Sequence, residues 1–345
     1  MRKPTLHDVA RTAGVSYATA DRVLNERGGV AQKSILRVRQ AIEDLGYERD
    51  QHAANLSRRR SYRFRFLAPQ GDHGFFRVLR AAVEAERAGR LADRVAIEIR
   101  DIPALDAEAL AAALDALGPA DCDSVAMVAI DTPRVAEAIA RLRGRGVPAV
   151  TLVADAGEAR VAHVGIDNVV AGRAAGRMIE IAHTGRPGRV LPVLGALTQR
   201  DHRDRLQGAV SVLEETGGRV EILPALVAGD RSDLMAEVMG AALAVPGAVT
   251  GVYSIGAGNR GLLPILRRMG QARPFVVLHE LTDFTRAALL DRLVDAVIDQ
   301  TPDREVALTL DVMKALADGR LLAGLDLTVT PKIYLQDNLP PAAEG

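Results

Sequence analysis

Polar and aromatic residues gather at the ends of short apolar stretches in the larger, C-terminal part of the chain. Two adjacent rings, Phe75 and Phe76, follow the first of these stretches, although aromatic residues make up only 3% of the sequence. Planar rings cover the apolar face of a sugar, while Asp, Asn, Arg and Gln side chains pair with its hydroxyl groups. A site for a sugar, polyol or sugar acid is therefore predicted among His73, Phe75, Phe76, Asp131, Asp155, Asp167, Asn168, Arg203, Arg205, Asn259, His279, Glu280 and Gln300.

The elements that position these loops are apolar stretches that alternate with amphipathic segments from Tyr62 onward. This alternation is typical of parallel sheets covered by helices, and ligands in such folds bind beyond the carboxyl ends of the strands. Nine strands over about 280 residues fit two lobes better than one sheet. The expected strands are residues 64–68, 95–99, 124–130, 149–152, 190–194, 220–223, 251–255, 275–279 and 296–298. Phe75 and Phe76 could instead pack in the core, which we expect of one ring at most.

Positive charge is concentrated at the start of the chain, although the net charge of the whole sequence is zero. Residues 1–65 contain 14 Arg or Lys and 7 Asp or Glu, a balance of +7, whereas the remaining residues contain 30 and 37, a balance of −7. A basic segment on an acidic body favours binding to a polyanion, and the alternative is an ordinary solvated surface. Charge alone leaves both interpretations open.

The basic segment has the pattern of three short helices. Thr5 and Asp8 have the spacing of a capping box at the start of the first helix, and Gly14 ends it. Ser16 is an N-cap candidate for a second helix, and residues 32–45 predict a third. A helix, a tight turn and a second helix form the unit that lays its second helix in the major groove of DNA. The alternative is a small helical bundle with exposed polar residues.

The residues of this segment resemble the head of the lactose-repressor (LacI) family over positions 5–60. The likeness rests on Thr5-Leu6-His7-Asp8-Val9-Ala10, Ala13-Gly14-Val15-Ser16, Thr19, Arg22-Val23-Leu24-Asn25 and Leu45-Gly46-Tyr47. In that family the residues just after the turn read bases, which implies this role for Tyr17, Ala18 and Arg22. The likeness places Ser16, Thr19 and Asn25 near the DNA backbone, and we count Thr5 with them. Ala20-Asp21 departs from the commoner Val-Ser pair, so no operator sequence can be carried over.

A hinge is expected between this head and the rest of the chain. Residues 50–57, followed by Arg58-Arg59-Arg60, resemble the short family helix that forms on the operator and wedges a Leu into the minor groove. Leu56 occupies the place of the wedge, and Ala53 lies one turn before it. An apolar wedge kinks DNA at a cost of a few kcal/mol in lost stacking. From the residues alone, a basic flexible linker explains the same segment.

The body resembles the ribose-type periplasmic binding proteins over residues 62–340, as the bodies of LacI-family proteins do. The likeness implies pocket positions for His73, Phe75, Phe76, Asp131, Arg203, Arg205, Glu280 and Gln300. Two departures argue against ribose itself: Val153-Ala154 stands where the ribose binder has an Asp-Arg pair, and Gly256 stands where it has Asn. We expect Asn259 to supply the missing amide. The predicted domains are a helix-turn-helix head at 1–49, a hinge at 50–61 and a two-lobed α/β body at 62–345.

Enzymatic alternatives have weaker support in the residues. Gly256, Gly258 and Gly261 match the G-x-G-x-x-G fingerprint after an expected strand, with Glu280 some twenty residues later, which favours a nicotinamide-dependent oxidoreductase. A dinucleotide site should begin a six-stranded unit, however, and too little chain follows. The sequence has no G-x-S-x-G and no H-E-x-x-H, and the lone Cys122 lies between two Asp residues, so no catalytic residue, metal or cofactor is predicted. His163, His183 and His202 are expected on the surface or in loops.

These patterns together predict a DNA-binding regulator controlled by a small molecule. A single small head buries too little surface for tight specific binding, so a homodimer on a pseudo-palindromic operator is expected, with pairing of dimers left open. The apolar runs are short and broken by charges, and one cysteine cannot form an internal disulfide, which favours a cytoplasmic protein without membrane contact. Whether the effector releases or promotes operator binding stays open, as do its identity and the regulated genes.

Overall fold

A computed structural model describes residues 4–24, 29–45, 61–70, 74–91, 93–256 and 258–341. The chain divides into two compact units, residues 1–60 and 61–345, which are described separately below. Four residues with expected binding roles, Asn25, Ala53, Leu56 and His73, lie outside the described residues.

Three helices form the first unit: α1 (Leu6–Ala13), α2 (Tyr17–Leu24) and α3 (Gln32–Leu45). The expected capping box starts α1, since Thr5 Oγ1 accepts from the Asp8 amide at 3.3 Å and the Thr5 amide donates to Asp8 Oδ2 at 2.9 Å. Gly14 ends α1 in the left-handed conformation at φ 61°, which glycine adopts at little cost. The three helices share a small core of Val9, Ala10, Ala13, Ala20, Val38 and Ala41. The all-α head and its helix-turn-helix are thereby confirmed.

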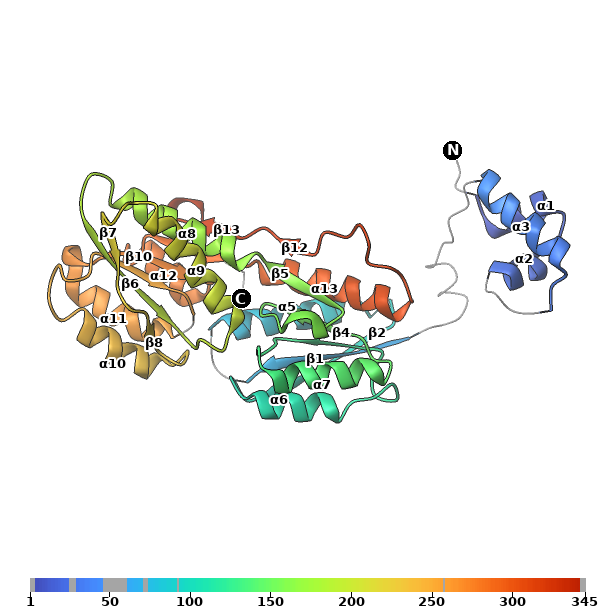
Figure 1. Cartoon of the computed structure of the whole chain (residues 1–345), viewed down its shortest axis with the longest axis horizontal. Helices are drawn as coiled ribbons and strands as arrows, with labels where there is room; N and C mark the ends of the chain where they lie inside the picture. Colours follow the sequence, from blue (N-terminus) through green and yellow to red (C-terminus); the bar gives the residue numbers. More distant parts are fainter. Residues whose placement is uncertain are drawn as a thin grey trace. The chain divides into compact units, whose positions relative to one another are not determined.

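The second unit contains two sheets, each forming one lobe (Figure 1). In the first lobe all neighbouring strands are parallel. Its order is β12 (Thr328–Val329), β5 (Ala162–Ile166), β4 (Ala149–Leu152), β3 (Ser124–Met127), β1 (Tyr62–Pro69) and β2 (Val95–Ile102). One face of this sheet packs against α5 (Gly74–Gly89) and α13 (Pro302–Ala317), and the other against α6 (Ala107–Asp115) and α7 (Pro133–Gly144) (Figure 1).

The sheet of the second lobe is parallel except at β13, which runs antiparallel to β11. Its order is β13 (Lys332–Tyr334), β11 (Ala296–Asp299), β10 (Phe275–His279), β9 (Gly251–Ser254), β6 (Gly188–Leu194) and β7 (Val220–Ile222), with β8 (Leu226–Val227) also paired to β6. Two helices, α8 (Asn168–Ala182) and α9 (Arg200–Glu214), pack on one face. The other face is covered by α10 (Ser232–Ala242), α11 (Asn259–Met269) and α12 (Asp283–Leu290). This arrangement confirms the two-lobed α/β body.

Three short connections carry the chain between the lobes. They run from β5 to α8, from β11 to α13 and from β12 to β13. Because only these connections are covalent, a change in the angle between the lobes requires backbone rotation at few residues.

Several sequence expectations need correction. The strand β5 was not anticipated, because His163 and Gly165 interrupt its apolar pattern, and β3 ends at Met127 rather than at residue 130. His183 and His202 are buried, with 1% and 5% exposure, and His163 lies within a strand, so the surface or loop assignment was wrong. His183 bonds to the Ile179 carbonyl at 2.7 Å and to Thr250 Oγ1 at 2.9 Å, which satisfies both ring nitrogens.

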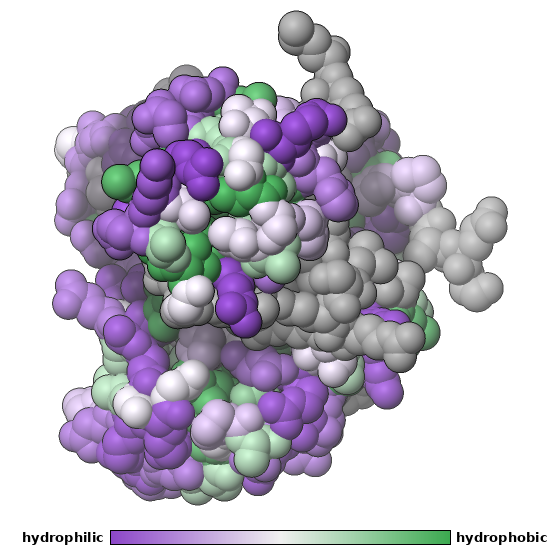
Figure 2. Space-filling view, turned by 90° about the vertical axis from the view of Figure 1, so that its right-hand side faces the viewer, coloured by the Kyte–Doolittle hydropathy of each residue, from purple (hydrophilic) through white to green (hydrophobic). Residues whose placement is uncertain are grey.

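None of the described helices is both long and apolar enough to cross a membrane. On the face drawn in Figure 2, hydrophilic side chains predominate and hydrophobic ones form small, separate patches.

The crossing of α8 and α9 depends on two glycines. A Cβ added at Gly172 would lie 2.0 Å from the Arg205 carbonyl oxygen, and one at Gly208 would lie 2.1 Å from that of Val169. Both obstacles are backbone atoms, so relief requires the helices to move apart.

We expect Gly172→Ala to destabilise the body by roughly 1–3 kcal/mol or more, because overpacking against backbone cannot be relaxed by a rotamer change. Gly144→Ala is the matched control: Gly144 also lies in a helix, and nothing lies within 4 Å of an added Cβ. Calorimetric unfolding of both variants provides the measurement. An unchanged transition temperature for Gly172→Ala contradicts this close crossing.

Candidate functional site

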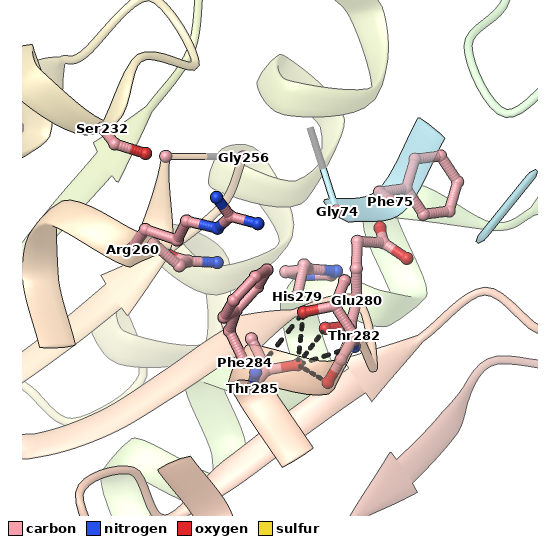
Figure 3. Close-up of a pocket in the computed structure, with 12 residues that line it drawn as sticks. Gly74, Phe75, Ser232, Gly256, Arg260, His279, Glu280, Thr282, Phe284 and Thr285 are labelled. Atoms are coloured by element: carbon pink, nitrogen blue, oxygen red, sulfur yellow. Dashed lines mark hydrogen bonds between the residues drawn. The ribbon is translucent and has the colours of Figure 1, made fainter. Parts of the chain in front are cut away.

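A cavity opens between the lobes, at the carboxyl ends of β9 and β10 (Figure 3). It encloses about 470 Å³, including space open to solvent. Two lining residues, Gly74 and Phe75, come from the first lobe, and the rest come from the second. The full lining among described residues is Gly74, Phe75, Ser232, Gly256, Gly258, Asn259, Arg260, His279, Glu280, Thr282, Phe284 and Thr285.

Glu280 is held in the cavity wall by groups behind it. Its Oε1 accepts a hydrogen bond from Gln300 Nε2 at 2.7 Å and lies 3.5 Å from Arg205 Nη2. Oε2 is buried and has no hydrogen-bond partner among the described residues. Burial raises the pKa of Glu280 to about 8, although the Arg205 guanidinium opposes that shift. The neutral form of Glu280 is therefore favoured more strongly than it is in an exposed carboxyl group.

Arg205 is the buried cation of the site, with only 2% of its surface exposed. Its Nε donates to Asn168 Oδ1 at 2.8 Å, and its Nη1 donates to the Ile255 carbonyl at 3.0 Å. The side chain thus joins the start of α8, the end of β9 and Glu280 after β10. Arg205 acts behind the cavity wall rather than in it.

His279 lies in the cavity wall. It is 1% exposed, and its Nε2 lies 2.7 Å from the Tyr253 hydroxyl, whereas its Nδ1 has no partner among the described residues. Burial lowers the pKa of His279 well below its usual value, so the ring is neutral. The buried Tyr253 hydroxyl needs an acceptor, and Nε2 is the acceptor within reach. With the Tyr253 hydroxyl as donor to Nε2, the ring proton is assigned to Nδ1.

The start of α11 forms the opposite wall. Ser254 Oγ donates to Asn259 Oδ1 at 2.6 Å, which leaves the Asn259 Nδ2 donor directed elsewhere. The Arg260 guanidinium carbon lies 3.6 Å from the centroid of the Phe284 ring, a cation–π contact visible in Figure 3. Gly258 caps α11 at φ 89° without a side-chain hydrogen bond.

The glycines of the 256–261 stretch have packing roles. A Cβ at Gly256 would lie 2.6 Å from Asp230 Oδ1, and a Cβ at Gly261 would lie 1.9 Å from the Ser232 carbonyl oxygen of α10. Close packing within the lobe therefore accounts for the glycine fingerprint without a dinucleotide.

In the first unit, the exposed side of α2 carries most of the expected DNA-binding residues. Ser16, Ala18 and Arg22 are exposed, Tyr17 is 48% exposed, and Thr19 is half-buried. The Tyr17 ring contacts the His7 ring at a centroid distance of 4.4 Å. Thr5 is half-buried, and its hydroxyl is engaged in the capping box.

Comparison with known proteins identifies both units. Residues 64–321 match the family described as "Periplasmic binding protein domain", and residues 5–50 match "Bacterial regulatory proteins, lacI family". The chain belongs to the periplasmic binding protein family, with a lacI-family head. In the part of this chain that the structure describes, no group of three or more His, Cys, Asp and Glu residues could hold a metal ion.

Relatives and solved structures agree with this assignment. HTH-type transcriptional regulator DegA of Bacillus subtilis (strain 168) is 25% identical over 217 residues, 62% of each chain, so the match spans about three fifths of that protein. The sucrose operon repressor of Vibrio alginolyticus is 48% identical over 52 residues, 15% of this chain and 55% of that protein.

The fold of the body is shared with solved sugar-binding proteins. The glucose-galactose binding protein GanP of Geobacillus stearothermophilus superposes with a TM-score of 0.73 at 19% identity, covering 82% of this chain and 100% of that one. A putative LacI transcriptional regulator from Bacteroides fragilis gives a TM-score of 0.70 at 14% identity, with coverage of 81% and 98%. At these identities the likeness concerns the fold alone.

The periplasmic-binding-protein body brings together part of the expected effector set. Phe75, Asn259 and Glu280 line the cavity, while Arg205 and Gln300 support Glu280 from behind. Phe75 also belongs to the core. Phe76 does not line the cavity; it is half-buried, packs against the core and contacts the Phe75 ring edge-on at 5.4 Å. Both rings therefore contact the core, whereas at most one was expected to.

Asp131 and Arg203 form an ion pair with each other rather than lining the cavity. Asp131 follows β3 of the first lobe and Arg203 lies in α9 of the second, so the pair links the lobes. Arg77 and Asp283 make a second link, at 2.8 Å, between α5 and α12. The Arg77–Asp283 pair is exposed and the Asp131–Arg203 pair is half-buried. Ion pairs in contact with solvent stabilise by at most about 1 kcal/mol each.

Sequence reasoning missed several lining residues. His279 was among the loop residues noted, but neither it nor Arg260 was included in the binding set. Ser232 begins α10 after a two-residue strand that is too short to show a pattern. Phe284, one of only six phenylalanines, carried a usable signal, because aromatic residues are rare in this chain.

We expect Glu280→Gln to change how stability depends on pH. The pKa of Glu280 is about 8 in the folded protein, against 4.5 for a glutamate exposed to water. Between these two values the folded state holds a proton that the unfolded state has lost, so the free energy of unfolding of the wild type falls as pH rises. The glutamine variant has no such proton. Its stability relative to wild type should rise by a few kcal/mol from pH 5 to pH 9 in urea unfolding.

Glu108→Gln serves as the control, because the Glu108 side chain is 75% exposed. Parallel pH profiles for wild type and Glu280→Gln would show that Glu280 ionises normally.

Proposed function

We propose that the protein is a sequence-specific DNA-binding transcription regulator, a repressor of carbohydrate uptake or catabolism genes whose operator binding is controlled by a sugar, polyol or sugar-acid effector. The observation that carries this proposal is the joining, in one chain, of an exposed reading helix in a lacI-family head to a cavity between two lobes. The protein would act in the cytoplasm, where the operator is.

The surface of α2 supports the DNA-binding part. Ala18 and Arg22 are four residues apart and exposed, so they share one face of the helix, with Tyr17 beside them. Arg is the side chain that most often contacts guanine in the major groove, and Ala18 offers only apolar contact. Ser16, Thr19 and Thr5 would contact the backbone, as Asn25 would outside the described residues.

The cavity supports effector control. The cavity lining combines residues from both lobes. A ligand bound there favours one angle between the lobes over another only if its contacts with the protein differ between the two arrangements. The link between Asp131 and Arg203 would stabilise the closer arrangement. We propose that effector binding releases the operator; relatives such as the sucrose operon repressor of Vibrio alginolyticus are named as operon repressors.

A homodimer would carry two heads to a pseudo-palindromic operator, and two dimers could pair further. The divisions of this proposal are the head at 1–49, the hinge at 50–61 and the body from 62 onward. In the hinge, Leu56 would be the wedge, with Ala53 one turn before it. A change in lobe angle would alter the spacing of the two hinges and so the fit of both heads to their half-sites.

Arg22→Ala should lower operator affinity by about 1–3 kcal/mol and relax base preference at one position of each half-site. Arg39→Ala removes the same charge from an exposed position of α3 and should lower affinity without changing base preference. Binding assays on an operator library selected with the wild type make the comparison. If the Arg22→Ala variant still discriminates between bases at every operator position, Arg22 does not contact bases specifically.

The effector and the operator DNA should each weaken the binding of the other to the protein by the same factor. A compound found by thermal shift at 100 times its dissociation constant stabilises the protein by about 2.7 kcal/mol. We expect that compound to weaken operator binding roughly 5- to 150-fold, and operator DNA to weaken the compound equally. Calorimetric titration of the compound with and without DNA tests this. A compound that leaves operator affinity unchanged argues against control through this cavity.

A further inference from the structure

The connection from β11 to α13 consists of Gln300 and Thr301. It carries the chain from the second lobe to the first, where α13 packs on the sheet. Thr301 has φ 60° and ψ 65°, which is the left-handed conformation. The other residues of the three connections between the lobes, at 167, 300, 330 and 331, are all described, and none has a positive φ. The unusual backbone of these connections is therefore confined to one residue.

Thr301 is poorly suited to the conformation that it adopts. Its side chain is β-branched, and such residues are rarely left-handed because Cβ then crowds the backbone. The Pro302 that follows favours an extended backbone at the residue before it. The Thr301 hydroxyl does not stabilise the conformation, since it is buried without a hydrogen-bond partner among the described residues. Strain of this kind persists only where neighbouring groups hold it in place.

The Asp299 carboxylate is the group that holds Thr301. Its Oδ2 accepts a hydrogen bond from the Thr301 amide at 2.9 Å. Its Oδ1 accepts one from the Leu281 amide, also at 2.9 Å. Asp299 is only 7% exposed, so water competes little for these two bonds. One buried carboxylate thus joins the interlobe connection to the segment that follows β10.

The segment that follows β10 is also a wall of the cavity. Glu280 and Thr282 line the cavity on either side of Leu281 (Figure 3). A second bond ties this wall to the connection, because Gln300 Nε2 donates to Glu280 Oε1 at 2.7 Å. A ligand that displaces the 280–282 segment therefore acts on the same groups that hold Thr301 in its strained conformation.

We propose that Thr301 is a strained pivot for movement of the lobes, and that Asp299 is the positioning residue that holds it. When the Asp299 bonds are lost, Thr301 returns to an extended conformation, α13 turns relative to β11, and the angle between the lobes changes. A ligand in the cavity shifts this equilibrium through the 280–282 segment. This inference rests on the proposed function, for which it supplies the step between effector binding and lobe angle.

The distance between the lobes tests the proposal in the full chain, without effector or operator. Spin labels at Ala140→Cys in α7 and Ala241→Cys in α10 report it, because both alanines are exposed and lie in different lobes. The natural Cys122 is 1% exposed and does not take the label. A large excess of unlabelled protein keeps each measured pair of labels within one chain. Dipolar electron paramagnetic resonance then gives the distribution of distances.

Asp299→Asn should shift this distribution. Asparagine keeps one acceptor oxygen but turns an N–H donor toward the other backbone amide. We expect the population with the wild-type distance, relative to all others, to fall roughly 5- to 150-fold, which corresponds to about 1–3 kcal/mol of strain. Adding Thr301→Gly should restore the wild-type distance, because glycine adopts the left-handed conformation at little cost.

Two further variants separate the pivot from general effects on folding. Asp295→Asn is the matched control: Asp295 Oδ2 accepts from the Val276 amide at 2.7 Å, but it precedes β11 and lies away from the connection. It should leave the lobe distance unchanged. Gln300→Met removes the bond to Glu280 and should shift the distribution in the same direction as Asp299→Asn. Circular dichroism establishes that each variant is folded, and Gln300→Met replaces Asp299→Asn if the latter is not.

The outcomes separate the inference from the proposed function. An unchanged distribution in the folded variant, or a shift that Thr301→Gly fails to reverse, overturns the pivot and leaves the regulator intact. An equal shift in Asp295→Asn also overturns it. Failure of the wild-type protein to bind any operator counts against the regulator instead, whatever the distances between the lobes.

Discussion

The buried guanidinium of Arg205 is the interaction on which the cavity depends. A charge with 2% exposure is stable only if its donors are satisfied, and here they reach Asn168, the Ile255 carbonyl and Glu280. These partners belong to three segments that are far apart in the sequence. Loss of any one of them leaves a buried donor of the guanidinium without its partner, so Arg205 fixes the ends of β9 and β10 relative to the start of α8.

Glycines allow that arrangement by bringing backbone segments close together. Gly172 lets α8 approach the backbone of Arg205 itself, so the helix crossing and the buried charge depend on each other. Gly261 does the same for α11 against α10, which places two helix starts side by side at the cavity. Between the lobes, the solvent-accessible ion pairs Arg77–Asp283 and Asp131–Arg203 are weak enough to rearrange.

The structural features that depend on residues close together in the sequence were predictable from the sequence. The caps at Thr5 and Ser16, the left-handed Gly14 and the alternation of strands and helices all follow from residues a few positions apart. The strand β5 was missed because its one polar residue, His163, is satisfied by Thr151 on the neighbouring strand, which no local pattern reveals. Asp131 and Arg203 were both expected to contact ligand, yet 72 positions apart in sequence they pair with each other.

Glu280 shows why residue types alone give an incomplete account of the cavity. In the sequence it counts as a negative charge, and a carboxylate would favour a partner with hydroxyl donors. Burial favours the neutral form instead, although the Arg205 guanidinium and the hydrogen bond from Gln300 oppose that shift of its pKa. Burial likewise keeps His279 neutral, with its Nε2 against the hydroxyl of Tyr253. The chemistry that this cavity offers to a ligand is therefore determined by the groups behind its walls as much as by the residues that line it.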